Sequence, residues 1–143
     1  MHNSFISNTY VSNPLITVKD NGTPLPIATA EYFNNTTTKL HVNYNIELDI
    51  DSFEPYEINL SEQGSDSILN NQTIDLTKLP EHTVSLIHNS TSKLMGISGF
   101  FEVDINGLEK SRKYTFAVEL KTSNKIIDTK STSILVYVNG ENK

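Results

Sequence analysis

The sequence predicts an all-β fold: an antiparallel sandwich of two sheets with about eight or nine strands. Three observations favour this fold class. Apolar and polar residues alternate over several short segments, turn-forming residues recur about every ten residues, and no segment has the apolar spacing of an amphipathic helix. Because the 143-residue chain contains no internal repeat or linker, the sandwich is expected to be one domain.

The clearest predicted strand covers residues 40–50. Its apolar positions are Leu40, Val42, Tyr44, Ile46, Leu48 and Ile50, and polar residues separate them. Successive side chains of a strand point to opposite sides of the sheet, so this spacing predicts a strand with one buried face. The same alternation returns after Pro55, at Tyr56, Ile58 and Leu60.

Weaker signals predict the remaining strands of the first two thirds. Pro24 and Pro26 indicate a sheet edge or a crossing between sheets, because proline cannot donate to a strand ladder. Gly96 and Gly99 indicate a bulge or a close approach of the backbone. Extended segments are expected at residues 15–19, 27–33, 74–76 and 83–88, with a turn at Asn70–Asn71 before the third of them.

The last third of the chain contains three more alternating segments. They are Phe101-Val103-Ile105, Tyr114-Phe116-Val118-Leu120 and Ile134-Val136-Val138, with a turn predicted at Ser123–Asn124 between the second and the third. Each has apolar residues at every second position, as expected for strands that cover one core.

Around the middle one of these segments the chain resembles the immunoglobulin-like and fibronectin type III-like sandwiches. Leu108 lies six residues before Tyr114, and Phe116 and Val118 follow at alternate positions. The resemblance implies a tyrosine corner, in which the Tyr114 ring is buried and its hydroxyl binds the backbone upstream. The sequence departs from the family pattern at Lys110 and Arg112, where proline and threonine are common, and it contains no tryptophan. Such folds support binding and adhesion more often than catalysis, an inference by analogy.

Residues 1–13 are mostly serine and asparagine with scattered apolar residues. They are expected to form a flexible or strand-exchanging arm, because chain ends are usually mobile unless another element holds them. The sandwich domain is then expected to cover residues 14–143.

The composition argues against several classes of function. The net charge is −6 and no run of Lys or Arg is present, so the phosphate-neutralising surface of a nucleic-acid-binding protein is not expected. No segment approaches the roughly 18 apolar residues of a membrane span, and the first residues do not form a signal peptide. The absence of cysteine excludes disulfides and thiolate metal sites. We expect an extracellular, cell-surface or virion location, and a cytoplasmic one stays open.

Candidate chemistry in the sequence is sparse. Asp49, Asp51 and Glu54 form a weak calcium candidate, because calcium prefers several oxygen ligands near a loop; solvated charges at a strand end are the alternative. The histidines His2, His41, His82 and His88 show no ligand spacing for zinc. No Gly-x-Ser-x-Gly nucleophile motif is present. We therefore expect no catalytic residue, no cofactor and no enzymatic activity.

These observations favour a non-enzymatic interaction or structural module of a cell surface or of a phage or virus particle. It is expected to act by protein–protein contact or self-association, through an edge strand or the arm. The alternative is a carbohydrate-binding module with a site on an exposed sheet face or at a loop end. Its candidate residues are His41, Asn43, Asn45 and Tyr137 on the outer rows of their strands.

Overall fold

The structure of the chain, a computed structural model, describes residues 4–17, 24–49, 55–64, 67–75 and 94–139. These residues form nine strands and no helix, so the described residues contain no helix that could cross a membrane. The strands are β1 (Phe5–Thr17), β2 (Pro24–Pro26), β3 (Thr29–Phe33), β4 (Thr38–Asp49), β5 (Tyr56–Glu62), β6 (Ile68–Ile74), β7 (Leu94–Ile105), β8 (Arg112–Thr122) and β9 (Lys125–Asn139).

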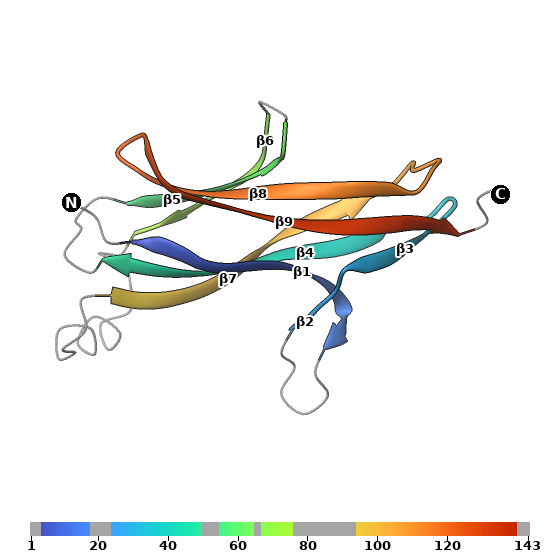
Figure 1. Ribbon diagram of the computed structural model, residues 1–143, viewed down its shortest axis with the longest axis horizontal. Helices are drawn as coiled ribbons and strands as arrows, with labels where there is room; N and C mark the ends of the chain where they lie inside the picture. Colours follow the sequence, from blue (N-terminus) through green and yellow to red (C-terminus); the bar gives the residue numbers. More distant parts are fainter. Residues whose placement is uncertain (1–3, 18–23, 50–54, 65–66, 76–93, 140–143) are drawn as a thin grey trace.

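The strands form two sheets packed face to face, and the predicted all-β sandwich is confirmed (Figure 1). The four-stranded sheet has the order β2-β1-β4-β7, and the five-stranded sheet has the order β3-β9-β8-β5-β6. All pairs are antiparallel except β3 with β9, which are parallel. The exception arises because the chain crosses from one sheet to the other between β2 and β3, where the two prolines predicted a crossing.

The longest predicted alternation forms the centre of the four-stranded sheet. β4 pairs with β7 from Thr38↔Ile105 to Asp49↔Leu94 without a shift of register. Its even-numbered apolar residues point into the sandwich, where Leu40, Val42 and Leu48 are fully buried. Burial of one such side chain contributes about 1.5–3 kcal/mol, which explains why this register is strongly specified.

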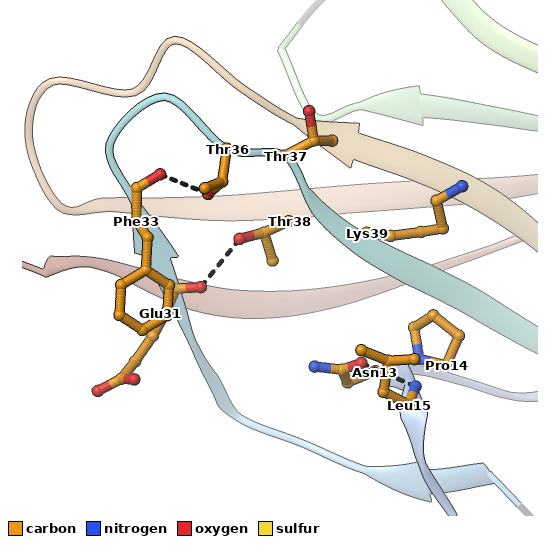
Figure 2. Close-up of a pocket in the computed structure, with 9 residues that line it drawn as sticks. All are labelled: Asn13, Pro14, Leu15, Glu31, Phe33, Thr36, Thr37, Thr38 and Lys39. Carbon is orange, nitrogen blue, oxygen red and sulfur yellow. Dashed lines mark hydrogen bonds between the residues drawn. The ribbon is translucent and has the colours of Figure 1, made fainter.

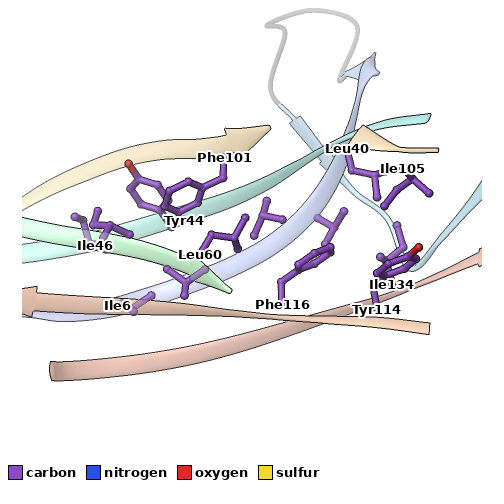
Figure 3. Close-up of a cluster of buried hydrophobic side chains, with 14 of the residues drawn as sticks. Ile6, Leu40, Tyr44, Ile46, Leu60, Phe101, Ile105, Tyr114, Phe116 and Ile134 are labelled. Atoms are coloured by element: carbon purple, nitrogen blue, oxygen red, sulfur yellow. The ribbon is translucent and has the colours of Figure 1, made fainter. Parts of the chain in front are cut away.

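The core lies between the sheets and takes residues from both (Figure 3). Its largest fully buried side chains are Tyr56, Phe101, Phe116, Ile6, Leu40, Ile46, Leu48, Ile58, Leu60, Leu120, Ile134 and Val11. Nearly all of them come from the alternating segments that the sequence shows. Ile6 and Val11 are the exceptions.

Those two residues belong to the expected arm, which from Phe5 onward is a strand of the sandwich. β1 lies between β2 and β4, and Ile6 and Val11 are each only 1% exposed. The register of β1 against β4 shifts between Ile6 and Asn8. Such a bulge moves the following residues to the opposite side of the sheet. Apolar residues an odd number of positions apart can then both face the core, and the alternation is hidden in the sequence.

Two local expectations in the middle of the chain need correction. Asn70 and Asn71 do not form a turn, because both lie in β6 and pair with β5. Gly96 and Gly99 do not mark a bulge, since β7 pairs regularly through both. The close approach is present, however: a Cβ atom on Gly99 would lie 2.3 Å from the hydroxyl oxygen of Tyr44. The predicted strand at residues 83–88 lies outside the described residues.

Three of the four residues of the expected corner lie on β8, and Leu108 precedes that strand. Tyr114, Phe116 and Val118 are buried on its inner face, and the half-buried Leu108 packs against the core. The turn at Ser123–Asn124 joins β8 to β9, and both residues have the positive φ that a tight two-residue hairpin requires.

The hydrogen bond that holds this corner comes from a different tyrosine. The hydroxyl of Tyr32, on β3, accepts a bond of 2.8 Å from the backbone N–H of Gly107. The Tyr114 ring instead carries the guanidinium of Arg112, which lies 4.3 Å from the ring centroid. The corner is therefore held by an edge strand of the same sheet, which the spacing of Leu108 and Tyr114 does not predict.

Side chains join the two sheets along both open sides of the sandwich. Gln72 on β6 donates to the backbone oxygen of Phe100 on β7 at 2.8 Å, and it accepts a bond from the hydroxyl of Tyr44. On the other side the N–H of Ile6 donates to the carboxylate of Asp128 at 2.7 Å. Both sides are thus closed by hydrogen bonds between edge or near-edge strands.

Candidate functional site

A shallow hollow of about 480 Å³ lies where the end of β1 faces the turn from β3 to β4 (Figure 2). We call it the β1–β3 hollow. Leu15 is 91% exposed and Phe33 is 49% exposed, although both are large apolar residues. Its lining consists of Asn13, Pro14, Leu15, Glu31, Phe33, Thr36, Thr37, Thr38 and Lys39.

The local sequence explains why the pairing of β1 with β4 stops beside this hollow. The pairing of β1 with β4 ends at Ser12↔His41, directly before Asn13 and Pro14. Proline has no N–H to continue the ladder. The side chain of Asn13 then accepts a bond of 2.9 Å from the N–H of Leu15. This local bond holds the segment that presents the Leu15 side chain.

A second hollow of about 490 Å³ adjoins the first on the outer face of β3 and β9. Tyr137 on β9 lies in register with Glu31 on the parallel neighbour β3, and it is 49% exposed. Asn13, Glu31 and Phe33 line both hollows. We call the exposed or half-exposed side chains of Leu15, Ile27, Phe33 and Tyr137 the apolar patch.

The two hollows of the patch share a negatively charged side chain. Glu31 lines both hollows and has no cation partner among the described residues. Lys39, at the rim, is bound elsewhere: its ammonium lies 2.5 Å from Glu102 and 4.0 Å from Asp104. The hydrogen bond with Glu102 raises the pKa of Lys39 above the usual value of a lysine. In return, Lys39 holds the pKa of the Glu102 carboxyl below the usual value of a glutamate.

The backbone of β3 at this edge is partly occupied by the following turn. Thr38 donates through its hydroxyl to the carbonyl of Glu31 at 2.9 Å. Thr36 donates to the carbonyl of Phe33 through both its N–H, at 3.2 Å, and its hydroxyl, at 2.5 Å. Occupied edge carbonyls hinder the addition of another strand. A partner at this edge would therefore bind mainly through side chains.

A third hollow, of about 450 Å³, lies on the outer face of the four-stranded sheet, and we call it the amide hollow. Asn43, expected to be an exposed residue, forms part of its floor and is only 5% exposed. His41 stacks on Phe100 at a ring-centroid distance of 4.1 Å. The hollow is lined by Tyr10, Pro24, Asn43, Tyr44, Asn45, Ser98, Gly99 and Phe100.

The predicted calcium candidate is only partly described. Asp51 and Glu54 lie outside the described residues. The N–H of Asp49 donates to the hydroxyl of Ser4 at 2.7 Å. No group of three or more His, Cys, Asp or Glu within the described residues could hold a metal ion. The calcium site therefore stays a prediction.

The residues proposed from sequence for a sugar site do not come together. His41, Asn43 and Asn45 lie on the four-stranded sheet, whereas Tyr137 lies on the five-stranded sheet beside the apolar patch. Sequence reasoning also missed Tyr10, which it assigned to the arm. Phe100 could have been found: the alternation at Phe101-Val103-Ile105 places it on the outer face.

Comparisons with known proteins show a distant likeness to a solved structure. No model of a protein family matches the chain, and no curated protein matches it. Among solved structures, a glycosyl hydrolase family 2 member from Bacteroides cellulosilyticus aligns with 14% identity and a TM-score of 0.44. The alignment covers 92% of this chain and 15% of that chain. A likeness at this TM-score does not bear on function.

Proposed function

We propose that this chain is a non-enzymatic interaction module that binds a partner protein through the apolar patch. The observation that carries the proposal is the exposure of Leu15, Phe33 and Tyr137 around two adjoining hollows. Exposed apolar side chains that gather around a concavity are typical of interaction sites, whereas single exposed apolar residues are common everywhere.

The charge of the patch indicates the chemistry of the partner. Glu31 is unpaired among the described residues, and the nearby Lys39 is neutralised by Glu102. Two copies of the patch facing each other would bring their Glu31 carboxylates together, which opposes a symmetric dimer. The partner is therefore a different protein, or a different surface, that presents apolar side chains beside Lys or Arg. Because Thr36 and Thr38 occupy the edge carbonyls, it docks through side chains and not by strand addition.

The same linings support a role in binding and not in catalysis. Among the described residues that line the two hollows of the patch, Glu31 and Lys39 carry charged side chains, and Lys39 is held by its ion pair. General acid–base or nucleophilic catalysis needs a reactive group positioned by a second one.

We also propose that the module belongs to a cell surface or to a phage or virus particle. The cysteine-free composition is compatible with these locations. We further propose that the chain is related to the immunoglobulin-like sandwiches, on the basis of the spacing of Leu108 and Tyr114.

A photo-crosslinking experiment tests this proposal. Phe33 is replaced by p-benzoylphenylalanine, and the matched control carries the same group at Ile126, which is 52% exposed on β9. In extracts of the source organism we expect one protein to be crosslinked from position 33 and not from position 126. Excess unlabelled wild-type chain should compete with that product, whereas excess Phe33→Asp should not. Equal crosslinking from both positions, or equal competition by both chains, would contradict the proposal.

A further inference from the structure

The amide hollow contains a row of side chains that the proposed protein contact does not use. Across the four-stranded sheet, Tyr10 on β1 pairs with Asn43 on β4, and Asn43 pairs with Phe100 on β7. Paired residues of neighbouring strands point to the same side of the sheet. An amide therefore lies between two aromatic side chains on the outer face.

The adjacent row is polar throughout. Asn8 pairs with Asn45, and Asn45 pairs with Ser98. The two central asparagines are two residues apart on one strand, which separates them by roughly 7 Å along the sheet. This distance is about the width of one sugar ring together with its hydroxyl groups.

The floor of the hollow offers a buried hydrogen-bond acceptor. The amide nitrogen of Asn43 donates to the hydroxyl of Ser12 at 2.8 Å and to the carbonyl of Tyr10 at 3.3 Å. These bonds fix the orientation of the amide. No donor among the described residues reaches its oxygen, although Asn43 is only 5% exposed. Buried polar atoms normally have a partner, so a donor from a ligand or from water is expected here.

Asn45 supplies the complementary group. Its side-chain oxygen accepts a bond of 2.5 Å from the hydroxyl of Ser98. This bond leaves the amide nitrogen as a donor without a partner among the described residues. An acceptor on Asn43 and a donor on Asn45 can together bind two hydroxyl groups, because a hydroxyl both donates and accepts.

The walls supply apolar contact without charge. Phe100 is 47% exposed, and its stacking on His41 at 4.1 Å restrains the ring. Tyr10 flanks the floor on the opposite side. Its strand lies two strand spacings, or about 10 Å, from the strand of Phe100. Within the described part of the chain, no lining residue of the hollow carries a charged side chain. An anionic ligand would find no cation here, whereas the C–H face of a neutral sugar can pack against an aromatic ring.

We propose that the amide hollow binds a neutral saccharide, with Asn43 and Asn45 binding its hydroxyl groups and Tyr10 and Phe100 contacting its ring. This inference is independent of the protein contact proposed above, because the amide hollow and the two hollows of the apolar patch share no described lining residue. It also differs from the expectation based on Tyr137, which belongs to the apolar patch.

Nuclear magnetic resonance titration of the full, ¹⁵N-labelled chain tests the proposal. The probes are neutral hexasaccharides of glucose, mannose, xylose and N-acetylglucosamine, with a hexasaccharide of uronic acid as the charged comparison. We expect saturable shifts of the side-chain amide signals of Asn43 and Asn45 with at least one neutral probe, and none with the acidic one. Phe100→Ala and Asn45→Ala should weaken the binding by at least about tenfold, equivalent to roughly 1.4 kcal/mol.

The matched control is Tyr137→Ala, which removes an aromatic side chain of nearly equal exposure, 49% against 47%, from the other sheet. It should bind the neutral probe as the wild type does. Three results would overturn the proposal: no saturable shift with any neutral probe, unchanged affinity in Phe100→Ala, or loss of binding in Tyr137→Ala alone. Failure of the crosslinking at position 33 has no bearing on these outcomes.

Discussion

The amide hollow and the apolar patch are built differently. The floor of the amide hollow lies in the middle of a sheet, where Asn43 is tied to Ser12 and Asn45 to Ser98 by hydrogen bonds. The apolar patch lies at a sheet edge, where the side chains of Leu15 and Phe33 are exposed. The local hydrogen bonds of these two residues use their backbone atoms and not their side chains.

The difference indicates what each region can recognise. A hollow whose polar groups are held in place before binding can select a small ligand by its hydrogen bonds, because little freedom is lost on binding. An exposed apolar edge gains mainly by removing surface from water, which favours a partner large enough to cover it. If the two regions are independent, a change in one should leave binding at the other intact.

Gly99→Val should damage the amide hollow and spare the patch. The new Cβ would lie 2.3 Å from the Tyr44 hydroxyl oxygen and 2.6 Å from its ring carbon Cζ. Tyr44 is buried and packs against Phe101, with the ring centroids 5.5 Å apart. We expect a loss of about 2–3 kcal/mol in the free energy of unfolding, as for other overpacked sites, measured by urea denaturation.

The control for this variant is Gly96→Val on the same strand. There the nearest atom to an added Cβ is the Glu47 carboxylate oxygen at 3.4 Å, on the outer face. A β-branched residue suits a strand, so the stability should stay equal or rise. Crosslinking from position 33 should persist in folded Gly99→Val. Its loss would show that the two regions depend on each other.

Tyr44→Phe should have an intermediate effect, because it removes a hydrogen bond and not a packed ring. The Tyr44 hydroxyl donates to Gln72, which ties β6 to the other sheet. Its loss should cost about 1 kcal/mol in the free energy of unfolding. Tyr137→Phe is the control, and it should change the stability by less than about 0.5 kcal/mol because that side chain is exposed. Equal losses in the two variants would contradict a structural role for the bond.

The same residue predicts a pH dependence. Burial raises the pKa of Tyr44 above its usual 10.0. Above pH 10 the unfolded chain therefore loses this proton before the folded one does. The corresponding stability is present below pH 10 and decreases as the pH rises towards the folded pKa. Tyr44→Phe should lose stability less steeply over that range.

Glu102→Gln should have the smallest effect on stability, because the pair with Lys39 is exposed and its strength is screened by solvent. The lowered pKa of Glu102 means that its contribution is present above the usual value of 4.5 and is lost as the pH falls through the folded pKa. The pKa of Lys39 is raised, so the contribution of the pair is also lost as the pH rises through that pKa.

The larger consequence of Glu102→Gln concerns binding. The substitution weakens the hold on Lys39 at the rim of the patch, so a basic partner should crosslink less from position 33. Unchanged crosslinking would argue against the charge selection proposed here.

Much of the fold follows from residues that are close in the sequence. The alternation from Leu40 to Leu48 specifies the buried face of β4, and Tyr114 to Leu120 does the same for β8. The prolines of β2 mark the crossing between the sheets. The first part of β1, before residue 15, escaped prediction because its bulge shifts the alternation. Most of β6 escaped because an exposed strand has no buried face for an alternation to mark.

Almost none of the candidate sites could be predicted, because they combine residues from separate strands. Tyr10, Asn43 and Phe100 are far apart in the sequence and meet through two strand pairings. Phe33 and Tyr137 meet through the parallel pairing of β3 with β9. None of these three pairings leaves a local signal.

The sequence by itself determined that the chain is a two-layer all-β protein and which face of most strands is buried. Side-chain direction alternates with every residue of a strand, so the order of apolar and polar residues indicates which face of the strand is buried. Only the tertiary structure decided which outer residues share a surface. That depends on the register between strands and on the bulge in β1, and both are selected by the burial of the whole core.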